Sequence, residues 1–371
     1  MELKKYKLGE CLELQRGYDL TSSQMQGGEV EVVGSNGIIG YHNSERGNSP
    51  CITVGRSGSV GKVHYYEQPT WAHNTALFIK DFKGNNPKYL YYLLKNLHLD
   101  NIFEKGSSVI PSLDRKLVHS LVVPFHKDIN DQRKVVDVLS AIDRKIELNK
   151  QINDNLEAMA KQLYDYWFVQ FDFPNEEGKP YKSSGGAMVW NEKLKREIPK
   201  GWNFCFLENL LIIRNGRDHK HLADGIYPVY GSGGEMRKVS EYLYDGESVL
   251  MPRKGSLNNI MYVNEAFWTV DTMFYSEMKQ SNCAKYIFYT IKDIDFTRWD
   301  SGTGVPSMTS STLYSIKLVK PQSEILKKFD EVISPLFEHM KHISEQNSFL
   351  TKQRDKLLPL LMNGQASVNS D

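Results

Sequence analysis

The chain has 371 residues, enough for two or three domains. Hydrophobic residues make up 40% and charged residues 25%, as in ordinary soluble globular proteins, and no run of about 18 apolar residues indicates a membrane span. The net charge of +1 demands no nucleic-acid partner, and four widely spaced cysteines without a C-x-x-C pair argue against a zinc site or a disulfide framework.

In chain order, residues 1–127 form the first predicted globular domain. Short runs rich in Val, Ile, Tyr and Trp, separated by Gly and Asn, predict strands and tight turns, and residues 86–97 predict a short helix. One turn, CITVGRSGSVGKVHY, resembles a phosphate-binding loop. However, five residues separate Gly55 from Gly61, and Val63 follows the lysine where a Mg²⁺-binding hydroxyl is required. We therefore expect no nucleotide site there.

Residues 128–172 predict a long central helix. Apolar positions step by four and three residues alternately, which is the pattern of a coiled-coil seam. The same pattern returns 194 residues later in a C-terminal helix, residues 322–364, where Asn153 falls on Asn347. Two matched asparagines predict paired helices, with both side chains meeting at one level. The predicted seam comprises Leu139, Ile142, Ile146, Asn153, Leu156, Leu163, Ile333, Leu336, Met340, Asn347, Leu350 and Leu357.

Residues 173–321 hold a linker and a second predicted globular domain. The segment 174–200 is polar and rich in Gly, Ser and Pro, so we interpret it as the linker, and residues 284–294 predict a short helix. In the C-terminal helix, Pro335 predicts a kink or a late start, and Gly364 predicts the stop before a tail at residues 365–371.

The two globular domains are copies of one pattern. VVGSNG at residues 32–37 returns as VYGSGG 197 residues later, and the Gly-rich turn returns at the same offset as SVLMPRKGSLNNIMY. Trp71 and Trp268, which we expect to be core residues, keep that offset. Internal duplication explains this constant offset better than chance similarity between turns does, because self-similarity at a fixed offset is the signature of a repeat.

Polar residues in the turns of both domains could contact nucleic acid. Arginine pairs with guanine and asparagine with adenine, whereas serine, lysine and backbone N–H groups hold phosphates. The candidates in the first domain are Arg16, Ser35, Asn36, Arg56, Ser57, Ser59, Lys62, His73, Asn74, Ser107 and Ser108. Those in the second domain are Arg214, Asn215, Arg217, His219, Lys220, Ser232, Arg253, Lys254, Ser256, Asn258 and Thr303.

Two of these features have specific readings. Arg56 and Arg253 are shared by both copies, which leaves open a common phosphate contact or a structural ion pair. RNGRDHKHLADG, from residue 214 to 225, has no close counterpart in the first domain, so it is a candidate for distinct sequence readout.

The sequence contains no catalytic motif that we can assign. No serine elbow, H-E-x-x-H motif or N-P-P-Y-like tetrapeptide occurs, and Glu177-Gly178-Lys179 reads as a solvated loop better than as a nuclease centre. A stand-alone nuclease or methyltransferase, and a coiled-coil module that binds protein, remain alternatives to a DNA-recognition protein.

The whole chain resembles the specificity (S) subunit of type I restriction–modification systems. The resemblance lies in the duplicated layout, in YPVYGSGG, VVGSNGIIGYHN, VGRSGSVGKV and GTGVPSM, and most strongly in DQRKVVDVLSAIDRKIELNKQINDNLEAMAKQLYDYWF. It implies an α+β fold: two similar β-rich target recognition domains separated by two long antiparallel coiled-coil helices, with an internal pseudo-twofold repeat.

The resemblance also implies a function. Each domain would read half of a split sequence in double-stranded DNA, and the helices would set the gap and dock two methyltransferase (M) subunits. Two restriction/motor (R) subunits would complete the complex. The chain would be cytoplasmic, without a membrane partner, and non-catalytic alone. It would bind no cofactor or metal, because S-adenosylmethionine would bind the methyltransferase, and ATP and Mg²⁺ the motor–nuclease.

Overall fold

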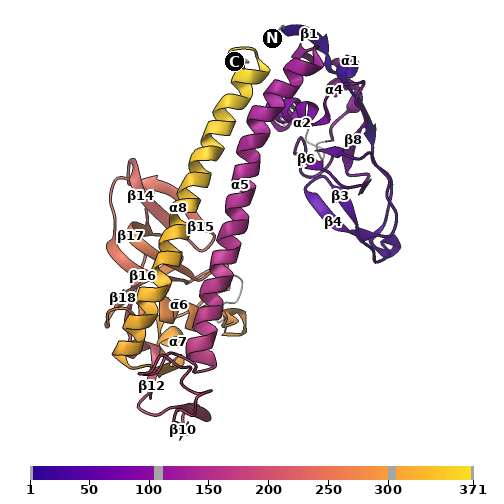
Figure 1. Ribbon diagram of the computed structural model, residues 1–371. Coiled ribbons are helices and arrows are strands. Elements are labelled where there is room, and N and C mark those ends of the chain that lie inside the picture. The colour runs from indigo at the N-terminus through magenta and orange to yellow at the C-terminus, as the bar shows by residue number, and fades with distance from the viewer. Residues whose placement is uncertain (1–2, 104–111, 300–305, 369–371) are drawn as a thin grey trace. The chain divides into compact units, whose positions relative to one another are not determined.

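The computed structural model describes residues 3–103, 112–299 and 306–368, and the chain divides into two compact units. The first unit comprises Met1–Gln151 with Ile343–Asp371, and the second comprises Ile152–His342. Two long helices, α5 (Ile129–Tyr164) and α8 (Ser323–Met362), each contribute to both units (Figure 1). Each unit therefore contains one globular domain and a part of each long helix.

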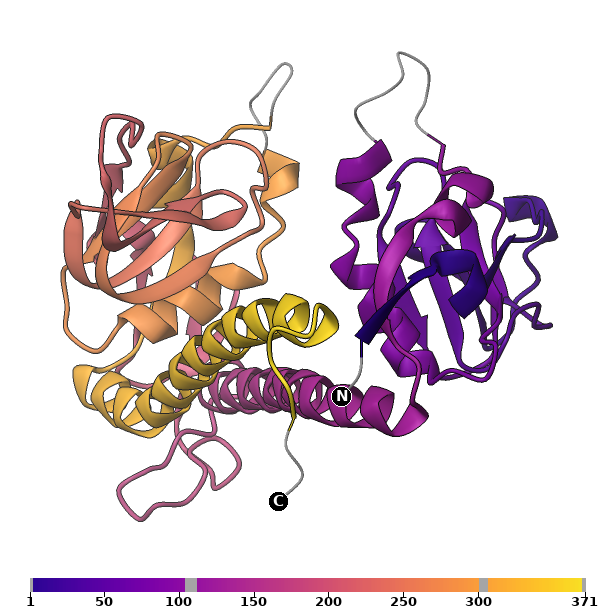
Figure 2. The same cartoon turned by 90° about the horizontal axis from the view of Figure 1, so that it is seen from above.

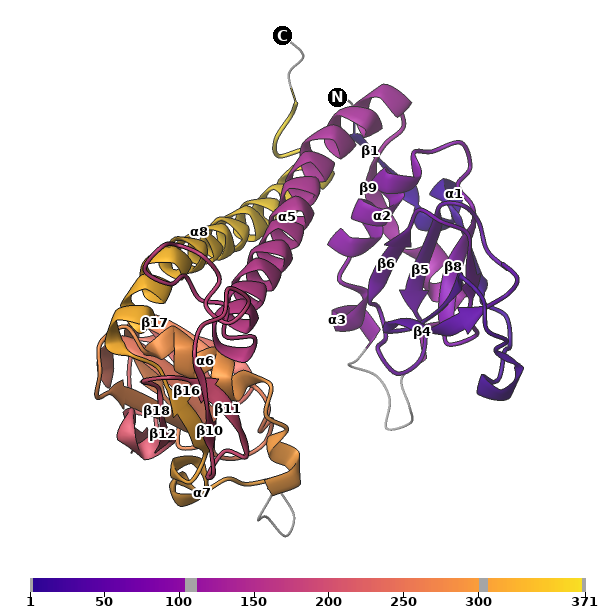
Figure 3. The same cartoon turned by 60° about the horizontal axis from the view of Figure 1, so that its bottom comes forward.

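The first domain contains a four-stranded sheet in the order β2-β8-β5-β6, a three-stranded sheet in the order β4-β3-β7, and the pair β1-β9. Figure 3 shows β6, β5 and β8 next to one another, with α2 beside β6. The strands are β1 (Leu3–Lys7), β2 (Glu13–Arg16), β3 (Val30–Gly34), β4 (Gly37–His42), β5 (Cys51–Gly55), β6 (Val63–Tyr66), β7 (Thr70–Ala72), β8 (Ala76–Asp81) and β9 (Val122–His126). The helices are α1 (Leu8–Cys11), α2 (Pro87–Asn96), α3 (Leu99–Phe103) and α4 (Arg115–Ser120), with a 3₁₀ turn at Ser22–Gln24.

The second domain contains a six-stranded sheet in the order β13-β18-β16-β17-β14-β15, the pair β12-β19 and the hairpin β10-β11. The strands are β10 (Met188–Asn191), β11 (Arg196–Pro199), β12 (Asn203–Phe206), β13 (Leu211–Asn215), β14 (Asp224–Gly231), β15 (Gly234–Val239), β16 (Tyr244–Pro252), β17 (Met261–Thr269), β18 (Met273–Met278) and β19 (Lys317–Lys320). The helices are α6 (Ala284–Lys292) and α7 (Ser310–Tyr314), with 3₁₀ turns at Leu207–Asn209 and Phe296–Trp299.

The segment predicted as a linker is partly structured. Its second half forms the β10-β11 hairpin, and Ile198 is buried with Phe173 and Trp202 in the core of the second unit. Composition alone does not reveal this packing, because the apolar side chains are spaced among polar residues. In its first half, Glu177 and Lys179 form an exposed ion pair of 2.8 Å, as suits a solvated loop.

The two domains differ at one long strand. In the second domain, β17 is continuous and pairs with β16 along one edge and with β14, in parallel, along the other. The first domain has two short strands, β6 and β7, in the same place, and they belong to different sheets. Pro69 lies between them, and proline has no N–H to donate to a neighbouring strand. The repeat therefore keeps its strand order while one sheet becomes two.

The short helices carry the aromatic core of each domain. Tyr89 and Tyr92 of α2 are buried, and so are Tyr286 and Tyr289 of α6 at the equivalent positions. Trp71 and Trp268 are buried as the sequence predicts. Because each short helix packs between its sheet and a long helix, these side chains join the domain to the long helices (Figure 2, where α6 is orange and α8 yellow).

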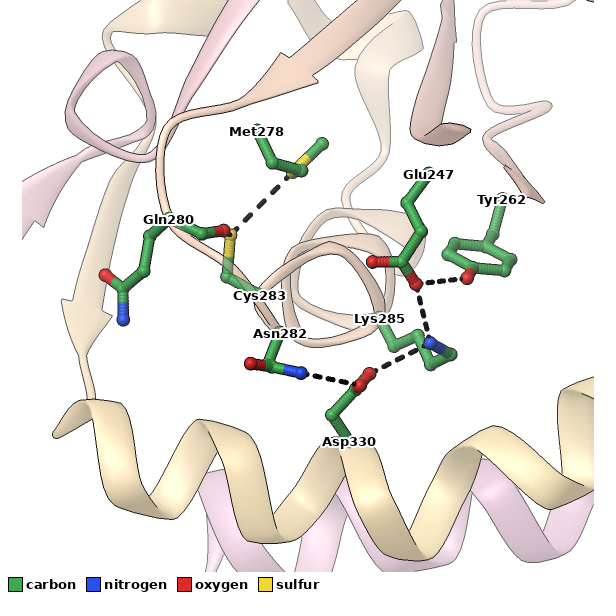
Figure 4. Close-up of polar contacts among 8 residues, drawn as sticks. All are labelled: Glu247, Tyr262, Met278, Gln280, Asn282, Cys283, Lys285 and Asp330. Carbon is green, nitrogen blue, oxygen red and sulfur yellow. Dashed lines mark hydrogen bonds and ion pairs between the residues drawn. The ribbon is translucent and has the colours of Figure 1, made fainter. Parts of the chain in front are cut away.

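The second unit has a buried charged network at this junction. Lys285 of α6 is 4% exposed, and its Nζ lies 2.7 Å from Glu247 Oε1 of β16 and 2.9 Å from Asp330 Oδ1 of α8 (Figure 4). Tyr262 donates a hydrogen bond to Glu247, and Asn282 donates one to Asp330 at 3.0 Å. The network therefore ties strand, short helix and long helix together.

The first unit lacks the acids of that network. The repeat places Lys88 at the position of Lys285, but Pro50 stands in place of Glu247 and Val136 in place of Asp330. Lys88 Nζ lies instead 4.0 Å from the centre of the Tyr65 ring and, among the described residues, makes no ion pair. The two junctions are thus equivalent in backbone and different in chemistry.

The long helices pack against each other in opposite directions. Arg354 Nη1 lies 3.1 Å from Asp143 Oδ1, and in the second unit Asn153 Nδ2 donates to the Met340 carbonyl at 3.4 Å. Residue numbers rise along α5 as they fall along α8, so the pairing is antiparallel. The structure buries Leu139 and Ile333 and leaves the ten other predicted seam residues half-buried.

The asparagines of the seam do not meet in the predicted way. Asn347 Nδ2 donates to the Ile146 carbonyl at 3.3 Å, which is the repeat equivalent of the Asn153–Met340 bond. The side-chain partner of Asn347 is Asn149, whose Nδ2 donates to Asn347 Oδ1 at 2.9 Å. The expected Asn153–Asn347 pair is wrong because, in an antiparallel pair, equivalent residues of a repeat face each other only on the symmetry axis.

The ends of the long helices differ from the predicted 128–172 and 322–364. Asp128 caps α5 by accepting a 2.8 Å hydrogen bond from the Asn130 N–H, and a π-helical turn at Asp165–Val169 follows the helix. Pro335 does not delay α8, which begins at Ser323. Gly364, with φ of +68°, stops α8 as predicted, and Gln365 N–H donates to the Leu360 carbonyl at 2.8 Å.

The burial of the four cysteines predicts that their thiols are unreactive in the native protein. All are buried, and burial raises the pKa of Cys11 and of Cys205 to about 11 and that of Cys283 to about 12. Because the thiolate is the reactive species, native protein should react with none of its thiols in a pH 8 disulfide-exchange assay, and denatured protein with four. Rapid reaction of a native thiol would contradict this burial.

Candidate nucleic-acid interface

The Gly-rich turn is built identically in both domains. In the first, the N–H groups of Arg56 and Ser57 both donate to the Thr75 carbonyl, at 2.9 and 3.1 Å. In the second, those of Arg253 and Lys254 both donate to the Thr272 carbonyl, at 2.8 and 3.2 Å. The backbone of the turn is thus a scaffold that presents different side chains.

Glycine is required at two matched pairs of positions, one in the Gly-rich turn and one directly after β2 and β13. Gly58 and Gly255 have φ of +80° and +88°, a left-handed conformation that other residues rarely adopt. At Gly17 and Gly216 a Cβ atom would lie 2.1 Å from the His73 carbonyl oxygen and 2.0 Å from the Val270 carbonyl oxygen. The repeat in sequence is therefore a repeat of backbone geometry.

The shared arginines are available for a ligand. Among the described residues neither Arg56 nor Arg253 forms an ion pair, and the Arg253 guanidinium lies over the Phe274 ring at 5.9 Å. Arg56 lines a polar pocket together with two further arginines. Its lining is Gln15, Arg16, Arg56, Leu77, Ser112, Leu113, Asp114 and Arg115. Of the two readings open from the sequence, the structural ion pair has no support among the described residues, and the phosphate contact stays a prediction.

Arg16 belongs to a small surface network at the rim of this pocket. It forms a 2.7 Å ion pair with Asp19, which also accepts a hydrogen bond from Asn74. The bond from Asn74, and after it the charge of Arg16, lower the pKa of Asp19, so this carboxylate is ionised at neutral pH. Both predicted residues are exposed or half-buried and could exchange Asp19 for a nucleic-acid partner.

The turn between β3 and β4 lies beside the Gly-rich turn. Lys62 Nζ donates to Asn36 Oδ1 at 2.7 Å, and both residues are exposed. In the second domain Asn259 Nδ2 donates to the Ser232 carbonyl at 2.9 Å, which joins the same two turns. Lys62 thus links two surface turns.

The first residues of the segment that begins at Arg214 have a structural counterpart in the first domain. Asn215 pairs with Phe274 as Arg16 pairs with Leu77, and Gly216 takes the place of Gly17. The offset here is two residues longer than in the rest of the repeat, which hid the match. Arg214 itself is engaged by Glu277, with contacts of 2.9 and 3.3 Å, and this partner raises its pKa.

Other candidates fall into three groups. His73 and Asn258 are committed within the fold, since His73 bonds Thr75 and the Leu20 carbonyl, and Asn258 bonds Asp295 and the Phe296 N–H. Exposed or half-buried candidates are Ser35, Ser57, Ser59, Arg217, His219, Lys220, Ser232, Lys254 and Ser256. Ser107, Ser108 and Thr303 lie outside the described residues.

The structure adds residues that the sequence did not single out. Arg115 joins the arginine pocket. On strand β4, Ile38 and Tyr41 are exposed, and on the equivalent strand β15 so are Glu235 and Lys238. The one available signal was their position directly after the matched turns VGSNG and YGSGG, because exposure of an apolar strand residue cannot be read from a single sequence.

Comparison with known proteins identifies the family. The family model described as "Type I restriction modification DNA specificity domain" matches residues 1–158 and 199–346. The chain is 28% identical over 340 residues to the type I restriction enzyme MjaIX specificity subunit of Methanocaldococcus jannaschii, covering 83% of this chain and 76% of that protein. It is 22% identical over 356 residues to the HindI specificity subunit of Haemophilus influenzae, covering 75% and 77%.

A solved structure agrees in fold. The crystal structure of the type I restriction–modification S subunit from M. genitalium matches with a TM-score of 0.64 and 18% identity, covering 97% of this chain and 96% of that one. The two family matches, one for each half, correspond to the internal repeat. The chain therefore belongs to the type I restriction–modification DNA specificity family. No helix in the described part of the chain is long and apolar enough to cross a membrane.

Proposed function

We propose that each globular domain reads one half of a bipartite sequence in double-stranded DNA, and that α5 and α8 set the spacing between the halves. The observation that carries this proposal is the pair of matched turns, with the same backbone hydrogen bonds and different exposed side chains. Two copies of one scaffold suit two stretches of the same polymer, and different side chains suit different bases.

In this proposal the chain acts without chemistry of its own. Two methyltransferase subunits dock on the long helices and methylate adenine with S-adenosylmethionine, and two motor–nuclease subunits use ATP and Mg²⁺. A repeated chain offers two equivalent docking surfaces to two identical subunits. The described residues bring together no set that we could assign to methyl transfer.

Methylome sequencing of cells that express this chain with its partner subunits tests the proposal. The expected result is one bipartite motif with a methylated adenine in each half. A continuous motif would refute reading by two domains. Methyl transfer by the purified chain alone would instead favour the enzyme alternative, and normal assembly without any DNA binding would favour the protein-binding module.

The spacing role has a separate test. One heptad inserted after Glu147 in α5, and one after Ser348 in α8, lengthens both helices by about 10 Å and keeps the seam in register. Because base pairs rise by 3.4 Å, the spacer should grow by about three base pairs, with both halves unchanged. The matched control carries the α5 insertion alone, which breaks the seam. If the double-insertion variant were active and recognised an unchanged spacer, the proposed role of α5 and α8 in setting the spacing would be refuted.

A further inference from the structure

Strands β4 and β15 are each an edge strand of their sheet. β4 ends the order β4-β3-β7, and β15 ends the six-stranded order. Along the six residues of each strand the exposure of successive residues is the same, with the second, third and fifth exposed. In the first domain this leaves Ile38 46%, Ile39 47% and Tyr41 52% exposed, and in the second domain Met236 is 60% exposed.

A β-bulge in each strand determines on which face of the hairpin the exposed residues lie. Val33 pairs with Ile38 and Val32 with Gly40, so Ile39 is an extra residue, and in the second domain Met236 is extra in the same way. Because of the bulge, Ile38 and Tyr41 stand on one face of their hairpin, and Glu235 and Lys238 on the matching face of the other. Each hairpin thus presents two outward side chains at equal spacing.

The bulge residue itself has a structural role common to both copies. A Cβ on Gly34 would meet Ile39 at 3.1 Å, and one on Gly231 would meet Met236 at 2.8 Å, so an apolar side chain covers a glycine in each. Ile39 and Met236 are thus apolar in both copies and contact a glycine in each, although they stay 47% and 60% exposed. The pair that changes chemistry completely is Ile38/Tyr41 against Glu235/Lys238.

We propose that these hairpin faces are base-reading surfaces, an inference that rests on the proposed function and assigns its specificity residues. A two-stranded ribbon fits the major groove of DNA. Ile38 and Tyr41 contact thymine methyl groups, and Glu235 and Lys238 read a C·G pair, the carboxylate accepting from cytosine N4 and the ammonium donating to guanine.

The surroundings of both faces fit this assignment. Asn36 and Lys62 lie at the turn that leads into β4, where they can meet phosphates. Glu31 stands opposite Tyr41 and is the acid on that face, whereas Lys238 stands opposite Pro228. Neither Glu235 nor Lys238 forms an ion pair among the described residues, so both charges are open to a ligand.

The other occupant of an exposed edge is a strand from a partner protein. Two identical partner subunits, however, require the same chemistry on both copies. An apolar pair in one copy and an acid with a base in the other contradict that requirement. Two half-sites of different sequence require different side chains on the two hairpin faces. DNA is therefore the ligand that fits both faces.

The first test replaces each thymine of the first half-site by uracil, one position at a time, and measures binding of the assembled complex by fluorescence anisotropy. Loss of one contacted methyl should weaken binding about fourfold at one or two positions. In the Ile38→Ala/Tyr41→Ala variant those positions should become insensitive to uracil. Equal affinity for all uracil probes with the unaltered protein would overturn the apolar assignment.

The second test is the methylation motif of complexes that carry Glu235→Gln or Lys238→Ala. One C·G position in the second half-site should relax by roughly tenfold while the first half stays unchanged. Val122→Ala, which shortens another exposed apolar residue of the first domain, is the control and should leave the motif intact.

The outcomes separate this inference from the proposed function. A bipartite motif that no hairpin variant alters overturns the reading surfaces and leaves the proposed function standing. Folded variants that fail to assemble with the methyltransferase show a protein-docking edge and overturn the inference. Absence of any bipartite motif for the unaltered chain overturns both.

Discussion

Replacing Lys285 with alanine is expected to destabilise the second unit by about 3 kcal/mol. The substitution leaves the carboxylates of Glu247 and Asp330 facing each other across the buried position of the lysine, without their counter-charge. Breaking a buried ion pair from one side costs about 3–5 kcal/mol, and the lower end applies because Glu247 is 29% exposed.

Urea unfolding followed by tryptophan fluorescence measures this loss. Five of the six tryptophans belong to the second unit, and Trp71 alone belongs to the first, so the signal reports mainly the altered unit. Lys285→Met combined with Glu247→Gln and Asp330→Asn should recover most of the stability, because no unpaired charge remains buried.

The repeat supplies a matched control in Lys88→Ala. Lys88 occupies the equivalent position, and among the described residues its ammonium group makes no ion pair and lies over the Tyr65 ring. The expected loss is therefore below about 1 kcal/mol. If both alanine variants lost the same small amount, the charged network would not be what holds the second domain to α8.

Replacing Asn149 with leucine is expected to destabilise the first unit by about 1–3 kcal/mol, even though leucine suits an ordinary seam position better. Asn149 is buried, and its Nδ2 donates to Gln346 Oε1 at 2.6 Å and to Asn347 Oδ1 at 2.9 Å. Leucine removes both donors and leaves two acceptors inside the seam without partners. Hydrogen exchange of the amides of α5 and α8 measures the loss in this unit.

Asn153→Leu is the matched control and should be neutral or stabilising. Asn153 Oδ1 is buried and has no hydrogen-bond partner in the described part of the chain, and its one bond, to the Met340 carbonyl, is long at 3.4 Å. Leucine therefore removes a buried polar atom that the fold does not satisfy. Equal destabilisation by both leucines would show that the two asparagines contribute alike.

Both predictions depend on the same property of the repeat: the two halves share a backbone but differ in their side chains. The backbone of the repeat is preserved at the turns, at the short helices and in the bonds from Asn153 and Asn347 to the opposite helix. The side chains around that backbone differ, with an ion network at one junction and a lysine on a tyrosine at the other. A repeat that preserves its backbone thus carries two domains that differ in chemistry.

Much of this fold was predictable because it depends on local rules. The step of four and three residues marks the long helices, since an α-helix has 3.6 residues per turn. Glycines that return at a constant offset mark the matched turns, since positive φ at Gly58 and Gly255 admits few other residues. Gly364 marks the end of α8 for the same reason. Each of these signals is complete within a short stretch of chain.

The tertiary structure alone decided which groups meet. The side-chain partner of Asn347 is Asn149 and not Asn153, and Arg214 pairs with Glu277. The sheet that is continuous in the second domain is divided in the first. The exposure of Ile38 depends on residues far apart in the chain. So does the pairing of Lys285 with two acids, whereas Lys88 makes no ion pair in the described part of the chain. Periodicity and backbone conformation are local properties, whereas desolvation and pairing belong to the packed molecule.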